Sequence, residues 1–451
     1  MIIVGGGIAG LSAAYDLKRA GHEVTLIEAA LRFGGKIGTV IEDGCLIEQG
    51  PDSIFCTKPW ALDLINELGL GDDLIEPQTS EFSILSKGRL HGVPRALATM
   101  MPTAATALEK VGFLSAAAKK RFMREKEVAK GESADESIAS FFRRRFGRHF
   151  SEMVAEPMLA GIHAGDPEKL SMNALYPGYM GMEREHGSLG EAMTNMKRPA
   201  SDPGRKVGFV SLRRGMESLT RRLVEELNGA KLMPGTKVTG LSSSAKGVSV
   251  MLESGETLLA DHLILAVPGF IAARLLATVA PNAASKLGGI QFVSTAVATL
   301  AYSRAAFPHG LHGNGFLVPF NEPCEITGCT WSSNKWAERA PEDALLMRCF
   351  MGRVGGLAVD DHSDAELIAK AVEEVSKILQ PMRGPIYQRL DRWPSAMAQY
   401  ELGHLELLAD AEVGLNGLPV QLIGSSYRGN SISDCVRQGR DAARMLEAMP
   451  V

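Results

Sequence analysis

A glycine pattern at the start of the chain restricts the possible folds more than any other feature. Ile2–Val4 is a short apolar run with the length of a buried parallel strand, and Gly5, Gly7 and Gly10 follow it with G-x-G-x-x-G spacing. In this spacing the first glycine permits a tight turn, the second permits close approach to a pyrophosphate, and the third permits close packing of a helix on the strand. The pattern predicts a strand that leads through a phosphate-binding turn into a helix.

The residues that follow complete a βαβ unit. An amphipathic run extends to Ala20, and a second apolar run, Val24–Ile27, is followed by the acidic residue Glu28. The helix N-terminus offers unpaired N–H groups and partial positive charge to phosphates, and Glu28 can accept hydrogen bonds from ribose hydroxyls. A glycine turn that serves packing alone is the alternative. Strand, glycines, helix, strand and acid together favour a dinucleotide site.

Composition excludes several classes of protein. The 451 residues are enough for two or three domains, and the net charge of −4 argues against a general nucleic-acid binder. The six cysteines form no Cys-x-x-Cys pair, so reduced buried thiols are expected rather than disulfides or a metal site. Because the first strand is expected to begin at residue 2, no signal peptide is expected. The longest apolar run, Leu263–Ala280, contains Pro268 and Arg274, so no membrane-spanning helix is expected.

A second strand–loop–helix motif lies near the other end of the chain. Residues 422–434 pass from an apolar run into a glycine-containing loop, and we expect a helix to begin near Ser433 as its N-cap. A helix N-terminus directed at a flavin ring would stabilise the negative charge that develops at the N1–C2=O edge on reduction. The alternative is an ordinary capped helix.

Six segments, spread in order along the chain, carry a specific resemblance. They are Val4–Leu11, Arg32–Lys36, Glu48–Ser53, Leu159–Asp166, Gln399–His404 and Tyr427–Cys435. Through them the chain resembles the flavin-dependent porphyrinogen oxidases, the protoporphyrinogen/coproporphyrinogen oxidase family of haem synthesis. The first two segments occur across the wider amine-oxidase-like flavoprotein group, whereas the others are far more specific. Thr330–Trp336 and Phe141–Arg145 are most similar to the Gram-positive branch, whose members favour coproporphyrinogen III.

The strand pattern and the resemblance together predict an α/β fold in three parts. Leu263–Val267 and Val420–Ile423 are the best candidates for parallel strands beside the opening βαβ unit, which makes the nucleotide domain discontinuous. We expect a discontinuous Rossmann-like FAD-binding domain, an α+β substrate-binding domain and an inserted all-helical domain of the membrane-associated type. The expected ranges are 1–53, 206–268 and 390–451 for the first, 54–86 and 269–389 for the second, and 87–205 for the third.

The resemblance implies non-covalently bound FAD. The implied contacts fall on Gly5, Gly7, Ile8, Ala9, Gly10, Glu28, Ala29, Arg32, Gly35, Lys36, Gly50, Pro51, Asp52, Ser53, Val238, Trp393, Gly424, Asn430, Ser431 and Ile432. Val238 lies where a backbone contact with the adenine is expected. Trp393 is expected either to form a wall beside the flavin or to be a core aromatic residue.

The resemblance also implies the reaction, which is removal of six electrons from a porphyrinogen in three two-electron rounds. Each round passes a hydride to flavin N5, and dioxygen then reoxidises the flavin to give hydrogen peroxide. The protein must mainly orient the macrocycle, and the sequence accordingly offers no obvious acid–base pair. No catalytic side chain is assigned.

Four residues are expected to contact the substrate. Gly161 and Ile162 are expected at the floor of the pocket. His163 stands where the family usually has tyrosine, and it can either meet a propionate or simply pack. Lys58 is expected near the propionates, with a solvated helix start as the alternative. Gly187 stands where the family usually has arginine, so one positive charge near the pocket is missing.

Several questions stay open at this point. Coproporphyrinogen III is the favoured substrate and protoporphyrinogen IX the alternative. An amine oxidase, a carotenoid desaturase or a flavin-bearing protein that delivers tetrapyrrole without turnover is a more distant alternative. A cytoplasmic location is expected. Peripheral contact with the inner face of the membrane through Leu97–Ala118, and contact with the next haem-pathway enzyme, are left open. Arg143–Arg145 and Lys119–Arg121 are expected to be solvated helix faces.

Overall fold

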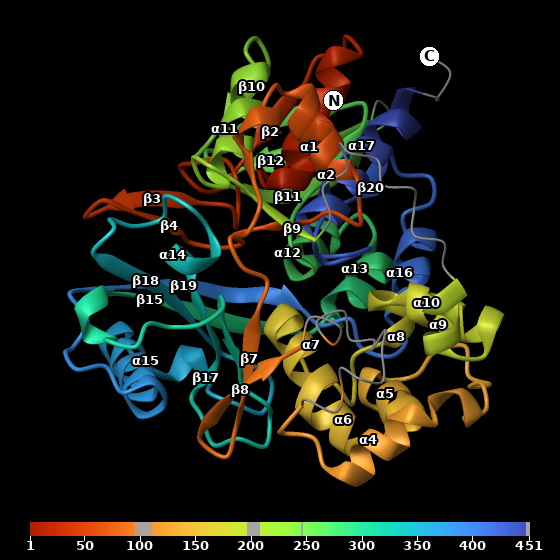
Figure 1. Cartoon of the computed structure of the whole chain (residues 1–451). Coiled ribbons are helices and arrows are strands. Elements are labelled where there is room, and N and C mark those ends of the chain that lie inside the picture. The colour runs from red at the N-terminus through yellow and green to blue at the C-terminus, as the bar shows by residue number, and fades with distance from the viewer. Residues whose placement is uncertain (95–96, 98–107, 109–110, 196–207, 245–246, 448–451) are drawn as a thin grey trace.

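The computed structural model describes residues 1–94, 97, 108, 111–195, 208–244 and 247–447 (Figure 1). A five-stranded parallel sheet forms the nucleotide-binding part, with strand order β10-β2-β1-β14-β20. Its strands are β1 (Ile2–Val4), β2 (Thr25–Ile27), β10 (Lys231–Met233), β14 (Leu263–Leu265) and β20 (Val420–Leu422). The two predicted partner strands are therefore confirmed, and this sheet combines segments from both ends of the chain. Its apolar runs are continuous because both faces are covered.

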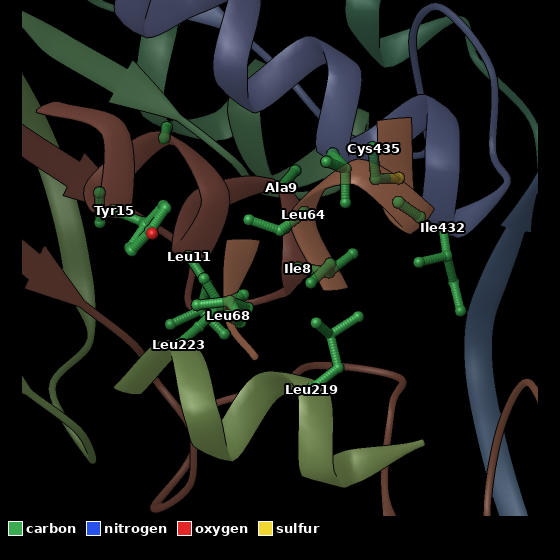
Figure 2. Close-up of a cluster of buried hydrophobic side chains, with 14 of the residues drawn as sticks. Ile8, Ala9, Leu11, Tyr15, Leu64, Leu68, Leu219, Leu223, Ile432 and Cys435 are labelled. Carbon is green, nitrogen blue, oxygen red and sulfur yellow. The ribbon is translucent and has the colours of Figure 1, made fainter. Parts of the chain in front are cut away.

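Helices pack on one face of this sheet. They are α1 (Ile8–Arg19), α2 (Trp60–Glu67), α11 (Glu217–Glu226) and α17 (Ile432–Glu447). Figure 2 shows Ile8 and Ala9 of α1 beside Ile432 and Cys435 of α17, with Leu219 and Leu223 of α11 below them. A side chain at Gly439 would run into the backbone of Ala9, so α1 and α17 cross in direct contact.

The other face of the sheet is covered by a small sheet and three helices. The strands are β11 (Val238–Ser244), β12 (Gly247–Leu252) and β13 (Thr257–Ala260), and the helices are α12 (Gly269–Leu276), α13 (Pro281–Gly288) and α16 (His404–Val413). β9 (Phe209–Leu212) pairs with the two-residue strands β5 (Ile54–Phe55) and β6 (Leu74–Ile75).

A mixed seven-stranded sheet forms a second layer, with strand order β19-β15-β18-β17-β16-β7-β8. Its strands are β7 (Phe82–Ser86), β8 (Arg89–Val93), β15 (Phe292–Ser303), β16 (Gly315–Leu317), β17 (Ile326–Trp331), β18 (Ala344–Met351) and β19 (Tyr387–Ala398). The helices beside it are α14 (Ser332–Lys335) and α15 (Asp364–Leu379), and β3 (Thr39–Glu42) and β4 (Cys45–Glu48) form a separate hairpin. The hairpin β7–β8 straddles the expected domain boundary at residues 86 and 87.

The remaining described segment is helical and lies beside the end of this sheet (Figure 1). It contains α4 (Ala116–Met123), α5 (Ile138–Phe146), α6 (Arg148–Phe150), a π-helical stretch (Ser151–Ala155), α7 (Glu156–His163), α8 (Met172–Leu175), α9 (Pro177–His186) and α10 (Leu189–Asn195). Phenylalanines of α4, α5 and α6 stack in its core. Helix α7 packs against β16 and β17, and it therefore connects this part to the large sheet.

The expectation of a solvated arginine run on α5 is wrong. Arg145 is 0% exposed and pairs with Glu125 and, at 3.0 Å, with Glu183. Arg144 pairs with Glu183 at 2.6 Å. Arg143 contacts Glu156, and both Arg143 and Arg144 remain partly open to water. Segments before and after α5 supply the carboxylates, so burial of the guanidinium groups is compensated.

Two stretches of the sequence lie largely or wholly outside the described residues. These are a proline- and glycine-containing stretch at 199–206, expected to be a surface loop, and most of the apolar segment 97–118. Every helix that the structure describes is too short or too polar to cross a membrane.

Candidate functional site

The opening glycines form an uncapped helix N-terminus with open space beside it. Gly5 has a φ of 108°, and Gly10 has no room for a side chain because the backbone of Gly5 lies against it. Gly7 is the N-cap of α1 and gives it no side-chain hydrogen bond. A Cβ at Gly7 would meet nothing nearer than Gly35 Cα at 4.0 Å. The free N–H groups of Ile8 and Ala9 and this open face fit a pyrophosphate.

Glu28 lies directly after β2, beside the glycine turn. Its carboxylate accepts hydrogen bonds from the Gly6 N–H at 2.6 Å and the Ala30 N–H at 2.8 Å. The connection between β10 and β11 lies next to it, since the Thr236 N–H donates to the Glu28 carbonyl at 2.9 Å. Val238 begins β11 and is buried. The structure thus brings the predicted ribose and adenine residues together.

The segment 29–36 closes over the same turn. Gly34 forms a bridge with Gly7. Arg32 is exposed and donates from its guanidinium to the carbonyls of Gly35 and Ile37, both at 2.9 Å. Ala29 is also exposed. Two donors of Arg32 therefore shape the loop, and its outer edge stays available to an anion.

Lys36 connects three distant segments. Its ammonium group donates to the Ala396 carbonyl and lies 3.3 Å from Ser425 Oγ. Burial lowers the pKa of Lys36 below its ordinary value. The ammonium group therefore lies between β19 and the loop that leads to α17.

Asp52, one of the expected FAD contacts, has a carboxylate that is surrounded by protein donors. Lys335 Nζ lies 2.9 Å and Trp336 Nε1 3.1 Å from its carboxylate, and Ser53 donates to it at 2.7 Å. Burial alone would raise the pKa of Asp52, but Lys335 and Arg348 hold it well below its usual range. The carboxylate is therefore committed to these partners, and residues 50–53 are left to contact a ligand through their backbone.

Trp393 lies on β19 beside the same segment. Its indole N–H donates to the Gln49 carbonyl at 2.9 Å, and a Cβ at Gly50 would lie 3.7 Å from its ring. The Gly50 carbonyl accepts a hydrogen bond from Arg348 at 2.5 Å. Trp393 is half-buried rather than a core residue, which keeps one face of the ring available.

The loop before α17 contains a second glycine with open space and leads to a second helix N-terminus. Gly424 has a φ of 121°, and a Cβ at this position would meet no atom within 4 Å. The predicted N-cap Ser433 is wrong, because Ser431 Oγ accepts the Asp434 N–H at 3.1 Å. Ser433 instead donates to the Lys58 carbonyl at 3.0 Å. Ile432 begins the helix and is buried against α1. Two adjacent helix N-termini fit a phosphate group and an electron-rich ring edge.

Lys58 does not stand alone at the pocket edge. Its ammonium group pairs with Asp434 in the first turn of α17, at 2.6 Å and 2.8 Å from the two carboxylate oxygens. The Lys58 side chain is 42% exposed. It is therefore an anchor for α17 as well as a cation that faces water.

His163 is buried and both of its ring nitrogens have partners. Nε2 lies 3.0 Å from the Tyr176 hydroxyl, and Nδ1 lies 3.0 Å from Asn430 Nδ2. Burial and the nearby Lys58 lower the pKa of His163 to about 4. Of the two roles considered for this histidine, the structure shows the packing role. It joins α7 to the loop before α17, and Ile162 beside it is 52% exposed.

Gly161 lies within α7, next to Ile162. Gly187 ends α9 in the left-handed conformation, with a φ of 77°. Its carbonyl accepts a hydrogen bond from Arg145 at 2.9 Å. Arg145 is thus the guanidinium found near Gly187, but it is buried in the helical part.

The sequence analysis did not assign some residues that support the site. Lys335, Trp336 and Arg348 hold segment 50–53, and Gln399 donates to the His163 carbonyl at 3.0 Å. Lys335 and Trp336 lie in the quoted segment Thr330–Trp336, and Gln399 begins the quoted segment Gln399–His404, so these segments were the available signals. Nothing in the local pattern pointed to Arg348.

Comparisons with known proteins agree with this geometry. The profile of the family described as flavin containing amine oxidoreductase matches residues 8–446. The chain is 34% identical to the coproporphyrinogen III oxidase of Bacillus subtilis, over 98% of this chain and 96% of that protein. It is 29% identical to the human protoporphyrinogen oxidase, over 98% and 97%. A crystal structure of a putative protoporphyrinogen oxidase from Exiguobacterium superposes with a TM-score of 0.88 at 31% identity, over 99% and 98%.

Proposed function

This chain belongs to the family of flavin-containing amine oxidoreductases, and from that premise we propose that it oxidises coproporphyrinogen III to coproporphyrin III with FAD in haem biosynthesis. Its relatives named coproporphyrinogen III oxidase extend over nearly the whole chain, at 28–34% identity for the first three. The chain is an FAD-dependent oxidoreductase. The observation that carries the proposal is the packing of α1 against α17, with open space beside Gly7 at the start of α1 and beside Gly424 in the loop before α17.

Different residues would contact different parts of FAD. The first turn of α1 would hold the pyrophosphate, Glu28 the ribose of the adenosine half, and the first turn of α17 the flavin edge. Trp393 and Lys36 would lie beside the ring. When bound, FAD accepts a hydride from a meso carbon of the macrocycle, and dioxygen is the electron acceptor that we propose.

The side chains nearest the proposed substrate floor orient rather than transfer protons. His163 cannot act as a general base at neutral pH, because both ring nitrogens are hydrogen-bonded and the ring is buried. The exposed side chain of Ile162 offers apolar surface to a macrocycle. Lys58 offers a cation whose exposed side can approach a propionate. The protein contributes position and charge, which suits a reaction whose chemistry resides in the cofactor.

The proposal is tested by anaerobic reduction. Purified protein, loaded with FAD, should lose the visible absorbance of its flavin on mixing with coproporphyrinogen III, and admission of air should restore it. Coproporphyrin III, which is already oxidised, is the matched control and should leave the flavin oxidised once the porphyrin's own absorbance is subtracted. An unbleached flavin with coproporphyrinogen III would refute the proposal.

Protoporphyrinogen IX is the second candidate substrate, because protoporphyrinogen oxidases are also similar over nearly the full chain. Side-by-side turnover of the two porphyrinogens separates the candidates. An amine oxidase role has weaker support, since the likeness to putrescine oxidase at 17–18% identity shows the fold alone. A cytoplasmic location, peripheral membrane contact and contact with the next haem-pathway enzyme remain predictions.

A further inference from the structure

His163 connects three segments that surround the proposed site. It is the last residue of α7 and is 4% exposed. Its carbonyl accepts a hydrogen bond at 3.0 Å from Gln399, which directly follows β19. On the ring, Nε2 lies 3.0 Å from the Tyr176 hydroxyl and Nδ1 lies 3.0 Å from Asn430 Nδ2. The residue therefore ties the end of α7 to the end of β19, to the segment between α8 and α9, and to the start of α17.

The contact with Asn430 fixes the state of the imidazole ring. The Nδ2 group of Asn430 can only donate, so Nδ1 accepts, and Nε2 carries the ring proton and donates it to the Tyr176 hydroxyl oxygen. Burial and the nearby Lys58 lower the pKa of His163 to about 4, so the ring is neutral at pH 7. Within the described part of the chain, Asn430 makes no other hydrogen bond. Loss of the ring would therefore release Asn430.

Asn430 directly precedes the first turn of α17. Ser431 is the N-cap, since its Oγ accepts the Asp434 N–H at 3.1 Å. The N–H groups of Ile432 and Ser433 have no acceptor among the described residues. In the proposed function these are the donors directed at the N1–C2=O edge of the flavin. Because Asn430 is bonded to the cap, the direction of both donors depends on how Asn430 is held.

We propose that His163 is a positioning residue for the flavin, and that through Asn430 it holds the start of α17 in the orientation that stabilises the reduced ring. The inference rests on the proposed function. The favourable field of a helix N-terminus falls off within its first turn, so a small shift of this turn changes how well it stabilises negative charge. His163 also follows the exposed Ile162 on α7. The same contact therefore fixes the proposed substrate floor relative to the flavin.

The test measures the midpoint potential of FAD bound to the protein, which requires no porphyrinogen. The amide of an asparagine side chain can take the place of histidine Nδ1, and that of a glutamine side chain the place of Nε2. His163→Asn should therefore keep the bond to Asn430 and the wild-type potential. His163→Gln should keep only the contact with Tyr176. Its ratio of reduced to oxidised flavin at a fixed potential should fall roughly tenfold, about 30 mV for a two-electron couple.

Two further variants separate positioning from packing. Asn430→Ala should lower the ratio as much as His163→Gln does, and the double variant should show no further decrease, because both changes remove the same interaction. Tyr176→Phe removes the other ring contact and is the matched control. It should lower the melting temperature and leave the potential unchanged. FAD content and melting temperature establish that each variant is folded and loaded.

If His163→Gln loses its FAD, Asn430→Ala provides the measurement. Equal potentials in the wild type, His163→Gln and Asn430→Ala would overturn the proposal and leave the proposed function standing. An equal fall in Tyr176→Phe would also overturn it, because general loosening of the packing would then explain the change. Failure of the proposed function appears in a separate measurement, the anaerobic mixing of wild-type protein with coproporphyrinogen III.

Discussion

Lys58 and Asp434 form an ion pair of 2.6 Å between residues that are 376 positions apart. Asp434 lies in the first turn of α17, where a carboxylate interacts favourably with the helix dipole. It also accepts a hydrogen bond from Ser431 at 2.6 Å. The pair therefore fixes the end of α17 that we assign to the flavin, and the cation proposed for the substrate is held by the cofactor side of the site.

Lys58→Ala should weaken FAD binding, because Asp434 loses its cation and the first turn of α17 loses an anchor. The Lys58 side chain is 42% exposed, so water screens the pair and the expected cost is at most about 1 kcal/mol, or roughly fivefold in Kd. Titration of apoprotein with FAD measures it. Lys286→Ala, which removes an exposed pair with Asp410, is the matched control. If the Kd of FAD is unchanged and the KM for coproporphyrinogen rises, Lys58 contacts the substrate and does not anchor α17 for FAD binding.

Gly7→Ala should lose FAD binding, whereas Gly10→Ala should lose stability. A Cβ at Gly7 has open space and a compatible backbone, so this variant should fold but bind FAD poorly, since the methyl group occupies the phosphate face. A Cβ at Gly10 runs into Gly5, so that variant should lose about 1–3 kcal/mol of unfolding free energy. Flavin content and the melting temperature of the apoprotein distinguish the two effects. Normal flavin content in Gly7→Ala would contradict the assignment of this face.

Glu28→Ala should release FAD more readily than the wild type does. The variant leaves the Gly6 and Ala30 N–H groups without their acceptor and removes the expected ribose partner. Glu28→Gln keeps one acceptor oxygen, so its FAD retention should lie between that of the wild type and that of Glu28→Ala. Glu253→Ala, at an exposed ion pair with Lys237, serves as the control. Full FAD occupancy of Glu28→Ala after dialysis would argue against the role of Glu28.

His163 should make the stability of the protein depend on pH. Its pKa is about 4 in the folded protein, against 6.5 for an unperturbed histidine. The unfolded chain binds this proton more readily than the folded chain does. The contribution of His163 to the free energy of unfolding should therefore be fully present above about pH 6.5, and about 3 kcal/mol should be lost as the pH falls to 4. Urea unfolding at several pH values measures the change.

His163→Phe should lack this pH-dependent component. It should also be less stable at neutral pH by about 1–3 kcal/mol, because Asn430 and the Tyr176 hydroxyl lose a buried partner. His163→Tyr, which restores the residue usual in the family, should lose the pH dependence with a smaller loss of stability. If wild type and His163→Phe show the same pH profile, the histidine does not titrate as proposed.

Features encoded within a short stretch could be predicted from the sequence. The opening βαβ unit depends on glycines and apolar runs within 28 residues, and the structure confirms its strands and helix. The turn residues Asp43, Gly44, Lys87 and Gly88 all have positive φ, which is typical of two-residue hairpin turns, and Asp-Gly is a sequence signal for such a turn. The strands β14 and β20 were found because they lie in mainly apolar runs of strand length, although β20 contains Gln421.

Features that depend on distant partners could not be predicted. The arginine run of α5 resembles a solvated helix face, and only the packing of Glu125 and Glu183 against it buries Arg145. Ser431 and Ser433 are equally good N-cap residues by type, and the tertiary contact of Ser433 with Lys58 separates them.

The contact between Gly439 and Ala9 also determines when the protein can acquire its cofactor. Helix α1 leaves the ribosome first, but the helix N-terminus beside it belongs to residues 432–447. A nascent chain therefore carries only half of the proposed site through most of its synthesis. We therefore expect FAD loading to follow translation, and a truncated product that lacks α17 to remain an apoprotein.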